Sequence, residues 1–180
     1  MFRLPDKVNG FTLIEIMVVM VIISVILTFT TLSIGDGGLS QKLEQEAQRL
    51  ASLLTMASQE AIMQSKEMGI SFENDRYHFY VLQKQQKQQK QQWQQLTDDI
   101  FRPRKLPSGI QLELNLEDQP IILNEEIKKN VPHLLLLSSG EFTPFEIIFS
   151  VSFNNTSYQL TGSATGKMCL QYQKNKDLHY

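Results

Sequence analysis

The sequence predicts an α+β protein in which a long N-terminal helix packs on a β-sandwich-like domain of two antiparallel sheets. Three observations carry this prediction. Residues 11–34 form one apolar run, the next segment repeats its apolar residues with a helical period, and short apolar runs between turn residues fill the rest. We therefore expect a helix whose first half spans a membrane and whose amphipathic second half covers the sheets.

The first part of the helix is expected over residues 11–34, where Glu15 is the only charged residue. A helix of about 24 residues measures about 36 Å, which is enough to cross a bilayer core of about 30 Å. A carboxylate inside such a segment costs roughly 2.5–3.5 kcal/mol at mid-membrane, and less near an end. Glu15 therefore predicts a partner that offsets this cost.

Residues 1–10 are polar and end at Gly10, immediately before the apolar run. A secretory signal peptide would place small residues in an A-x-A-like pattern after its apolar region, and no such pattern follows Leu27. The small-residue boundary here is the step from Gly10 to Phe11. Cleavage at this step would leave the apolar helix on the mature protein, with Phe11 as its new amino terminus.

The residues Gly10-Phe11-Thr12-Leu13-Ile14-Glu15 resemble the processing site of type IV pilins and type II secretion pseudopilins. The resemblance implies that a prepilin peptidase cleaves between Gly10 and Phe11 and methylates the new terminal Phe11. It also implies that Glu15 meets the terminal amine of a neighbouring subunit during filament assembly. An amine and a carboxylate that are desolvated together attract each other strongly, which agrees with this role. The alternative is a signal anchor in which Glu15 only favours the positive end of its own helix.

Composition and charge narrow the function further. A hydrophobic content of 42% suffices for a core, and a formal net charge of -2 gives no electrostatic footprint for nucleic acid. Positive residues precede the apolar run and Asp36 follows it. We therefore expect a single-pass protein of the bacterial inner membrane, with a cytoplasmic amino terminus before cleavage and a periplasmic C-terminal domain. The lone Cys169 cannot form an internal disulfide and is expected to be a small buried residue.

A glycine hinge and an amphipathic helix are expected over residues 35–67. The glycines of residues 35–38 each weaken a helix by roughly 1 kcal/mol relative to Ala. Beyond them, apolar residues recur at alternating steps of four and three, at Leu43, Ala47, Leu50, Leu54, Ala57 and Ala61. This stripe is expected to pack on the sheets, with Glu46, Arg49 and neighbouring glutamines off the stripe.

A β-rich globular domain is expected over residues 68–180. Two apolar runs that flank residues 74–76 predict a hairpin. Residues 84–95 are almost entirely Gln and Lys, which predicts a mobile loop, with Trp93 docking the returning chain onto the core. Further strands are expected at 110–116, 121–123, 134–137, 146–153, 158–161 and 168–172.

Longer blocks extend the resemblance, because residues 49–72, 102–110 and 134–147 are similar to the minor pseudopilin H family of type II secretion. This implies a structural subunit at or near the tip of the periplasmic pseudopilus that helps export folded proteins across the outer membrane. It implies as partners the other minor pseudopilins, the major pseudopilin, the prepilin peptidase/methyltransferase and the inner-membrane assembly platform. A minor pilin of the FimT/FimU kind, which shares this plan, is the alternative within the superfamily.

Neither a catalytic set nor a cofactor or metal site is predicted. His78, His133 and His179 lie in separate segments without the paired spacing of metal ligands. Residues 162–167 resemble a phosphate-binding loop only superficially, because one residue is missing between the glycines and Met168 replaces the required Ser or Thr. That segment is expected to be a turn. We expect a structural protein rather than an enzyme, and the alternative from another class is a signal-anchored, monomeric periplasmic binding domain.

Overall fold

The computed structural model describes residues 12–32, 37–84, 91–123, 131–151 and 154–174. The chain divides into two compact units, Met1–Gly38 and Leu39–Tyr180, and each is described by itself. The expected leader, residues 1–10, lies outside the described residues.

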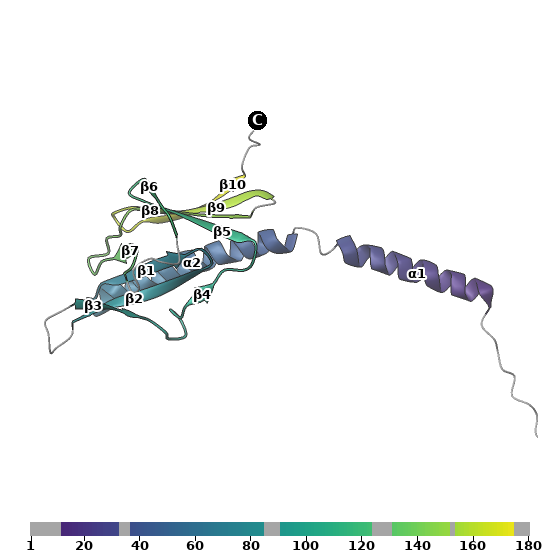
Figure 1. The fold of residues 1–180 in the computed structure, drawn as a ribbon, viewed down its shortest axis with the longest axis horizontal. Helices are drawn as coiled ribbons and strands as arrows, with labels where there is room; N and C mark the ends of the chain where they lie inside the picture. The colour runs from purple at the N-terminus through teal and green to yellow at the C-terminus, as the bar shows by residue number, and fades with distance from the viewer. Residues whose placement is uncertain (1–11, 33–36, 85–90, 124–130, 152–153, 175–180) are drawn as a thin grey trace, which may run out of the picture. The chain divides into compact units, whose positions relative to one another are not determined.

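The first unit contains the helix α1, Leu13–Leu32 (Figure 1). Its large apolar side chains between Leu13 and Ile26 are 43–79% exposed. They occur on all sides of the helix rather than along one stripe, so α1 has no polar face to turn toward water. Among the helices that the structure describes, none combines the length and hydropathy required to cross a membrane.

The helix α2, Gly37–Gln64, carries the predicted apolar stripe. All six predicted stripe residues are fully buried in the core, which confirms the 3.6-residue period that predicted them. Of the expected hinge, residues 35 and 36 lie outside the described residues, whereas Gly37 and Gly38 are the first residues of α2.

The prediction that Glu46 lies off the stripe was wrong, because Glu46 is only 6% exposed. It is three residues after Leu43 and four before Leu50, so it shares their face of the helix. Its carboxylate forms an ion pair with the half-exposed Arg49. The buried face of α2 is therefore wider than the apolar stripe and includes one charged group.

Two antiparallel sheets make up the rest of the second unit (Figure 1). The first sheet has the order β3-β2-β1-β7, with β4 also paired to β2; the second has the order β10-β9-β8-β5-β6. The strands of the first sheet are β1 Met68–Glu73, β2 Arg76–Lys84, β3 Gln91–Gln95, β4 Arg104–Lys105 and β7 Leu134–Leu136. Those of the second are β5 Ile110–Leu116, β6 Gln119–Ile121, β8 Phe145–Val151, β9 Asn154–Gly162 and β10 Met168–Lys174.

The β1–β2 hairpin and the six later strands were predicted, with β6 displaced two residues toward the N-terminus. Their alternating apolar residues face inward, as β8 shows by alternating buried and half-buried positions along its length. The inward faces of both sheets and the stripe of α2 enclose one core. At its centre Tyr77 lies between Phe72 and Phe79, with ring centroids 6.4 and 6.1 Å apart. The α+β fold with a helix packed on two antiparallel sheets is confirmed.

The predicted loop over residues 84–95 was wrong at its ends. Residues 85–90 lie outside the described residues, but Lys84 ends β2 and Gln91–Gln95 forms β3. Strand β3 pairs antiparallel with β2, and Trp93, opposite Leu82, is half-buried. The backbone groups of β2 offer a ladder of hydrogen bonds to any extended neighbour, and this offsets the poor strand propensity of glutamine.

The prediction of a buried Cys169 was also wrong, because its side chain is exposed. Cys169 lies on β10, the edge strand of the second sheet, and its pairing partner is Thr161 of β9. Residues 163–167 connect these two strands, and the Ser163 amide donates to the Lys167 carbonyl at 2.9 Å. The prediction of a turn in this segment is confirmed.

Candidate functional site

The expected assembly residue, Glu15, lies in the first turn of α1. Its backbone amide donates to the Thr12 carbonyl at 3.1 Å and lies 3.4 Å from the Thr12 hydroxyl. Thr12 therefore occupies the N-cap position, and the residues Thr12-Leu13-Ile14-Glu15 match the S/T-x-x-E pattern of a capping box. Sequence reasoning missed this role of Thr12, although the spacing of Thr12 and Glu15 was a sufficient signal.

The Glu15 side chain is exposed, and it forms no hydrogen bond or ion pair with any residue that the structure describes. A carboxylate in the first turn is favoured by the positive end of the helix dipole, typically by about 0.3–1 kcal/mol. That gain is small beside the cost of burying a charge in lipid or among apolar helices. Among the residues that the structure describes, no side chain offsets the rest of this cost.

The expected processing residues, Gly10 and Phe11, lie outside the described residues. Of the three predicted site residues, the structure therefore describes Glu15 alone. Thr12 is the first described residue, and α1 begins directly after it.

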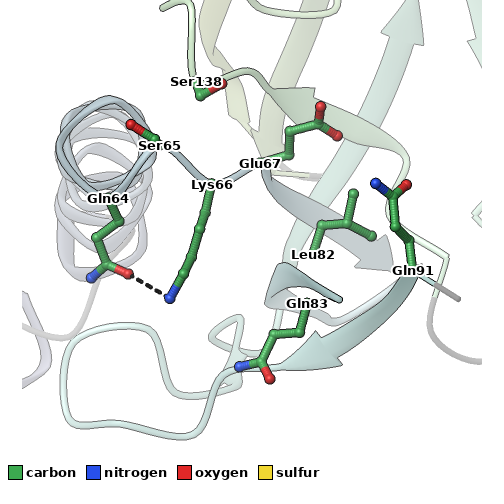
Figure 2. A pocket seen from close by; sticks show the side chains of 8 residues that line it. All are labelled: Gln64, Ser65, Lys66, Glu67, Leu82, Gln83, Gln91 and Ser138. Atoms are coloured by element: carbon green, nitrogen blue, oxygen red, sulfur yellow. Dashed lines mark hydrogen bonds between the residues drawn. The ribbon is translucent and has the colours of Figure 1, made fainter. Parts of the chain in front are cut away.

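A polar cavity of about 530 Å³ lies at the C-terminal end of α2 (Figure 2). Its lining includes Ser65 and Lys66, and the Lys66 ammonium donates to the Gln64 side chain at 3.2 Å. Ser65 has a φ of 51° and ends the helix. Two backbone hydrogen bonds close this end: the Lys66 amide donates to the Ala61 carbonyl at 3.1 Å, and the Ser65 amide donates to the Ile62 carbonyl at 3.2 Å. This is a Schellman ending with serine at the position that glycine usually occupies. Among the lining residues that the structure describes, Lys66 and Glu67 are the charged ones, and these residues include no nucleophile with an adjacent base.

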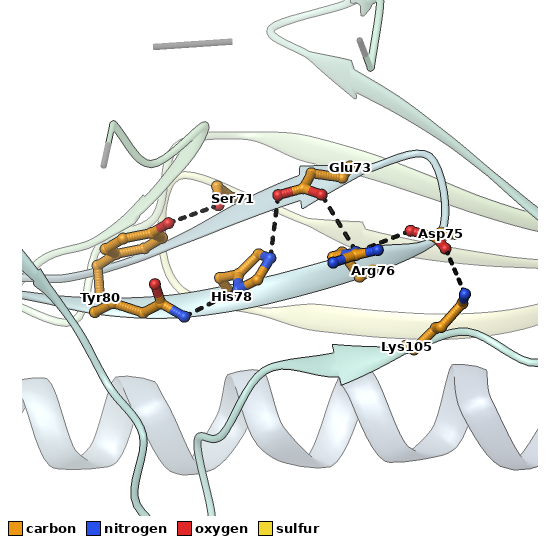
Figure 3. A network of polar contacts seen from close by, with 8 residues as sticks. Ser71, Glu73, Asp75, Arg76, His78, Tyr80 and Lys105 are labelled. Carbon is orange, nitrogen blue, oxygen red and sulfur yellow. Dashed lines mark hydrogen bonds and ion pairs between the residues drawn. The ribbon is translucent and has the colours of Figure 1, made fainter. Parts of the chain in front are cut away.

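A network of polar side chains joins the β1–β2 hairpin to β4 (Figure 3). Glu73 contacts His78 at 3.1 Å and Arg76 at 3.3 Å, and Arg76 donates to Asp75 at 2.9 Å. The Asp75 carboxylate also forms an ion pair with the Lys105 ammonium, at 3.1 Å. Hydrogen bonds from Arg76 and Lys105 lower the pKa of Asp75. These pairs are largely exposed, so each stabilises the domain only slightly, and together they tie the turn to the neighbouring strand.

His133 supports the fold through a hydrogen bond to the backbone of β1. Its Nδ1 accepts the backbone amide of Phe72 at 3.0 Å, and burial lowers the pKa of the imidazole. Across the described ranges, no three His, Cys, Asp or Glu side chains are grouped closely enough to hold a metal ion.

The long helix packed on two antiparallel sheets, preceded by an apolar helix with a first-turn glutamate, defines the class of type IV pilin-like subunits. The family model "Type II transport protein GspH" matches residues 46–166, and "Prokaryotic N-terminal methylation motif" matches residues 6–31. The chain therefore belongs to the GspH family, the minor pseudopilins of the type II secretion system, which are structural proteins rather than enzymes.

Individual relatives agree with this assignment. The type II secretion system protein H of Pseudomonas aeruginosa is 39% identical over 146 residues, which cover 77% of this chain and 81% of that protein. A crystal structure of the minor pseudopilin EpsH of Vibrio cholerae has a TM-score of 0.61 at 21% identity, covering 77% of this chain and 99% of that one. The solution structure of Escherichia coli GspH has a TM-score of 0.59 at 18% identity, covering 76% and 92%. The two solved structures show the fold, and the N-terminal motif implies prepilin peptidase processing of a subunit anchored in the inner membrane.

Proposed function

We propose that this chain acts mechanically, as a minor subunit at or near the tip of the periplasmic pseudopilus that helps export folded proteins across the outer membrane. In this proposal the apolar run of residues 11–34, which contains α1, anchors the subunit in the inner membrane as a single-pass segment, and the β-rich domain is periplasmic. The observation that carries it is an exposed, all-round apolar helix whose first-turn carboxylate has no side-chain partner among the described residues. A helix that is apolar on all sides is unfavourable in water, so it requires a membrane or neighbouring helices around it.

Processing is the first step of the proposed mechanism. The prepilin peptidase cleaves between Gly10 and Phe11 and methylates the terminal amine of Phe11. The match of the methylation motif to residues 6–31 supports this site, because the match spans the Gly10–Phe11 step and Glu15. Before cleavage the amino terminus is cytoplasmic.

Assembly follows when Glu15 meets the terminal amine of a neighbouring subunit. Extraction from the membrane then exchanges lipid contacts of α1 for contacts with neighbouring helices, which are equally apolar. The ion pair offsets the cost of burying both charges, so a subunit in the correct register is favoured over one that leaves either charge unpaired. The other minor pseudopilins and the major pseudopilin supply the neighbours, and the inner-membrane assembly platform receives the processed subunit.

Substitutions at Glu15 test the assembly role. Glu15→Leu and Glu15→Gln should insert into the membrane at least as well as the wild type, because each removes a charge from an apolar segment. Cross-linking to the other pseudopilins should be lost in Glu15→Leu and weakened in Glu15→Gln, whose amide still accepts a hydrogen bond. Unchanged cross-linking in both variants would favour a signal-anchored monomeric domain and reject the assembly role.

A separate variant tests processing. Gly10→Val should remain at precursor size in cells that contain the peptidase, because a branched side chain at the scissile position crowds the enzyme. It should still enter the membrane, since α1 is unchanged. Gly38→Ala, a glycine substitution remote from the cleavage step, is the control and should be processed normally. A Gly10→Val protein of mature size would show that cleavage occurs elsewhere.

A further inference from the structure

Strand β10, Met168–Lys174, is an edge strand of the second sheet, and its outer edge has no pairing partner among the described residues. It pairs with β9 along all seven of its residues without a register shift. The opposite edge of that sheet, β6, has three residues and includes Pro120. Pro, short length, bulges and charged residues are common means of protecting a sheet edge. Strand β10 has no Pro or bulge and is seven residues long, and its one charged residue, Lys174, is at its end.

The direction of the backbone groups on β10 follows from two contacts with β9. The hydroxyl of Thr161 donates to the Cys169 carbonyl, and that of Ser157 donates to the Gln173 carbonyl, each at 3.4 Å. The carbonyls of Cys169 and Gln173 therefore point toward β9. Because backbone groups alternate in direction along a strand, those of Met168, Leu170 and Tyr172 point away from the sheet. Each of these residues offers one amide and one carbonyl to an added strand.

The side chains of β10 alternate between an apolar face and a polar face, and an added strand must have the same alternation. Leu170 packs against the core, and Tyr172 is 55% exposed, with its ring 5.4 Å from that of Tyr158. Cys169, Gln171 and Gln173 lie on the other, polar face and are all exposed. A strand that joins this edge therefore needs apolar residues on one face and uncharged polar residues on the other.

We propose that β10 is a homotypic docking edge, to which a second copy of this chain adds its own β10 in antiparallel orientation. With Gln171 opposite Gln171 of the second copy, all seven residues of each strand are paired. This register places Leu170 opposite Tyr172 on the apolar face and Cys169 opposite Gln173 on the polar face. Each outward amide and carbonyl meets its counterpart, and no charges face each other between residues 169 and 173. The inference concerns self-association and does not depend on the proposed role in secretion.

The register makes the test specific. In Gln173→Cys, the new thiol should lie opposite the native Cys169 of the second copy, in a pair whose Cα atoms are about 4.5 Å apart. That separation is within the range of disulfides. The two residues of one chain are four positions apart, roughly 13 Å along the strand, so they cannot form the bond internally. Mild oxidation of the purified full chain in detergent should give a disulfide-linked dimer on non-reducing gels.

Three controls make each outcome decisive. Gln173→Cys combined with Cys169→Ser should lose the dimer, and so should Gln173→Cys combined with Tyr172→Lys, which adds a charge to the edge. Gln111→Cys adds an exposed thiol on β5, in the interior of the sheet, and should not cross-link to Cys169. Thermal unfolding should match the parent for each variant. Absence of the dimer in Gln173→Cys, its persistence with Cys169→Ser, or equal cross-linking in Gln111→Cys would overturn the proposal.

Discussion

The ring of Phe145 lies over Gly162, its direct partner in the β8–β9 ladder. A Cβ atom at Gly162 would be 2.0 Å from Cε1 of Phe145 and 2.5 Å from Cζ. Phe145 is itself only 4% exposed, and its ring packs 6.4 Å from that of Phe142. The absent side chain of Gly162 is thus what lets the aromatic ring fill this part of the core.

Gly162→Ala should lower the free energy of unfolding, because Phe145 must leave its rotamer or the strands must separate. Overpacking of this kind typically costs about 1–3 kcal/mol. Urea denaturation monitored by circular dichroism measures the change. Gly38→Ala is the matched control, since no atom lies within 4 Å of its added Cβ and alanine favours helix. Equal stability of Gly162→Ala and the parent would contradict the close packing.

Ser65→Gly should stabilise the domain. Ser65 has a φ of 51°, in the left-handed region that costs an L-residue roughly 1–2 kcal/mol and glycine almost nothing. Because glycine also loses more entropy on folding, we expect a net gain of about 0.5–1 kcal/mol. Ser65→Val, with a branched side chain at the same φ, should be destabilised. The order Gly above Ser above Val in denaturation midpoint is the result to look for.

Because of Tyr77, the free energy of unfolding should fall as pH rises in the alkaline range. Its hydroxyl is buried and has no hydrogen-bond partner among the described residues. Burial, with a smaller contribution from Glu46, raises its pKa to about 12. Since the folded pKa lies above the unfolded value of 10.0, the stabilisation is complete below pH 10 and is lost as pH rises toward about 12. At about 1.4 kcal/mol per pH unit, the loss over this interval is roughly 3 kcal/mol.

Tyr77→Phe isolates this effect, because the ring stays in the core and the ionisable group is gone. Between pH 10 and 12 the free energy of unfolding should therefore fall less in this variant than in the parent. At pH 7 it should be as stable as the parent or slightly more so, because it removes an unpaired buried hydroxyl. Strong destabilisation at pH 7 would reveal a hydrogen bond that Tyr77 depends on.

Because of His133, the free energy of unfolding should fall as the pH is lowered into the mildly acidic range. Its folded pKa is lowered from 6.5 by burial, so the unfolded chain binds a proton at a higher pH than the folded one. The stabilisation is therefore present above pH 6.5 and is lost as pH falls below that value. His133→Asn keeps an acceptor for the Phe72 amide but has no titration in this range. Its unfolding free energy should vary less than the parent's between pH 7 and 5, and equal slopes would contradict the lowered pKa.

Much of the fold could be predicted because its signals are local. The apolar residues of α2 recur at a helical period, and all six predicted positions are fully buried. Strand β5 has its predicted bounds, since strict alternation over seven residues fits no other regular structure. The N-terminal motif likewise indicated Glu15 from sequence alone, whereas the roles of Gly10, Phe11 and Glu15 in processing and assembly stay predictions.

The tertiary structure decided what depends on neighbours distant in sequence. Glu46 is buried because it shares the face of α2 that packs into the core, and the spacing of apolar residues does not show how wide that buried face is. Gln91–Gln95 becomes a strand because β2 offers it a hydrogen-bonding edge, although glutamine alone favours no strand. Cys169 is exposed because its side chain lies on the outer face of β10, the edge strand, opposite the face on which Leu170 packs against the core. Strand order is set by long-range pairing, which the composition of a single segment does not encode.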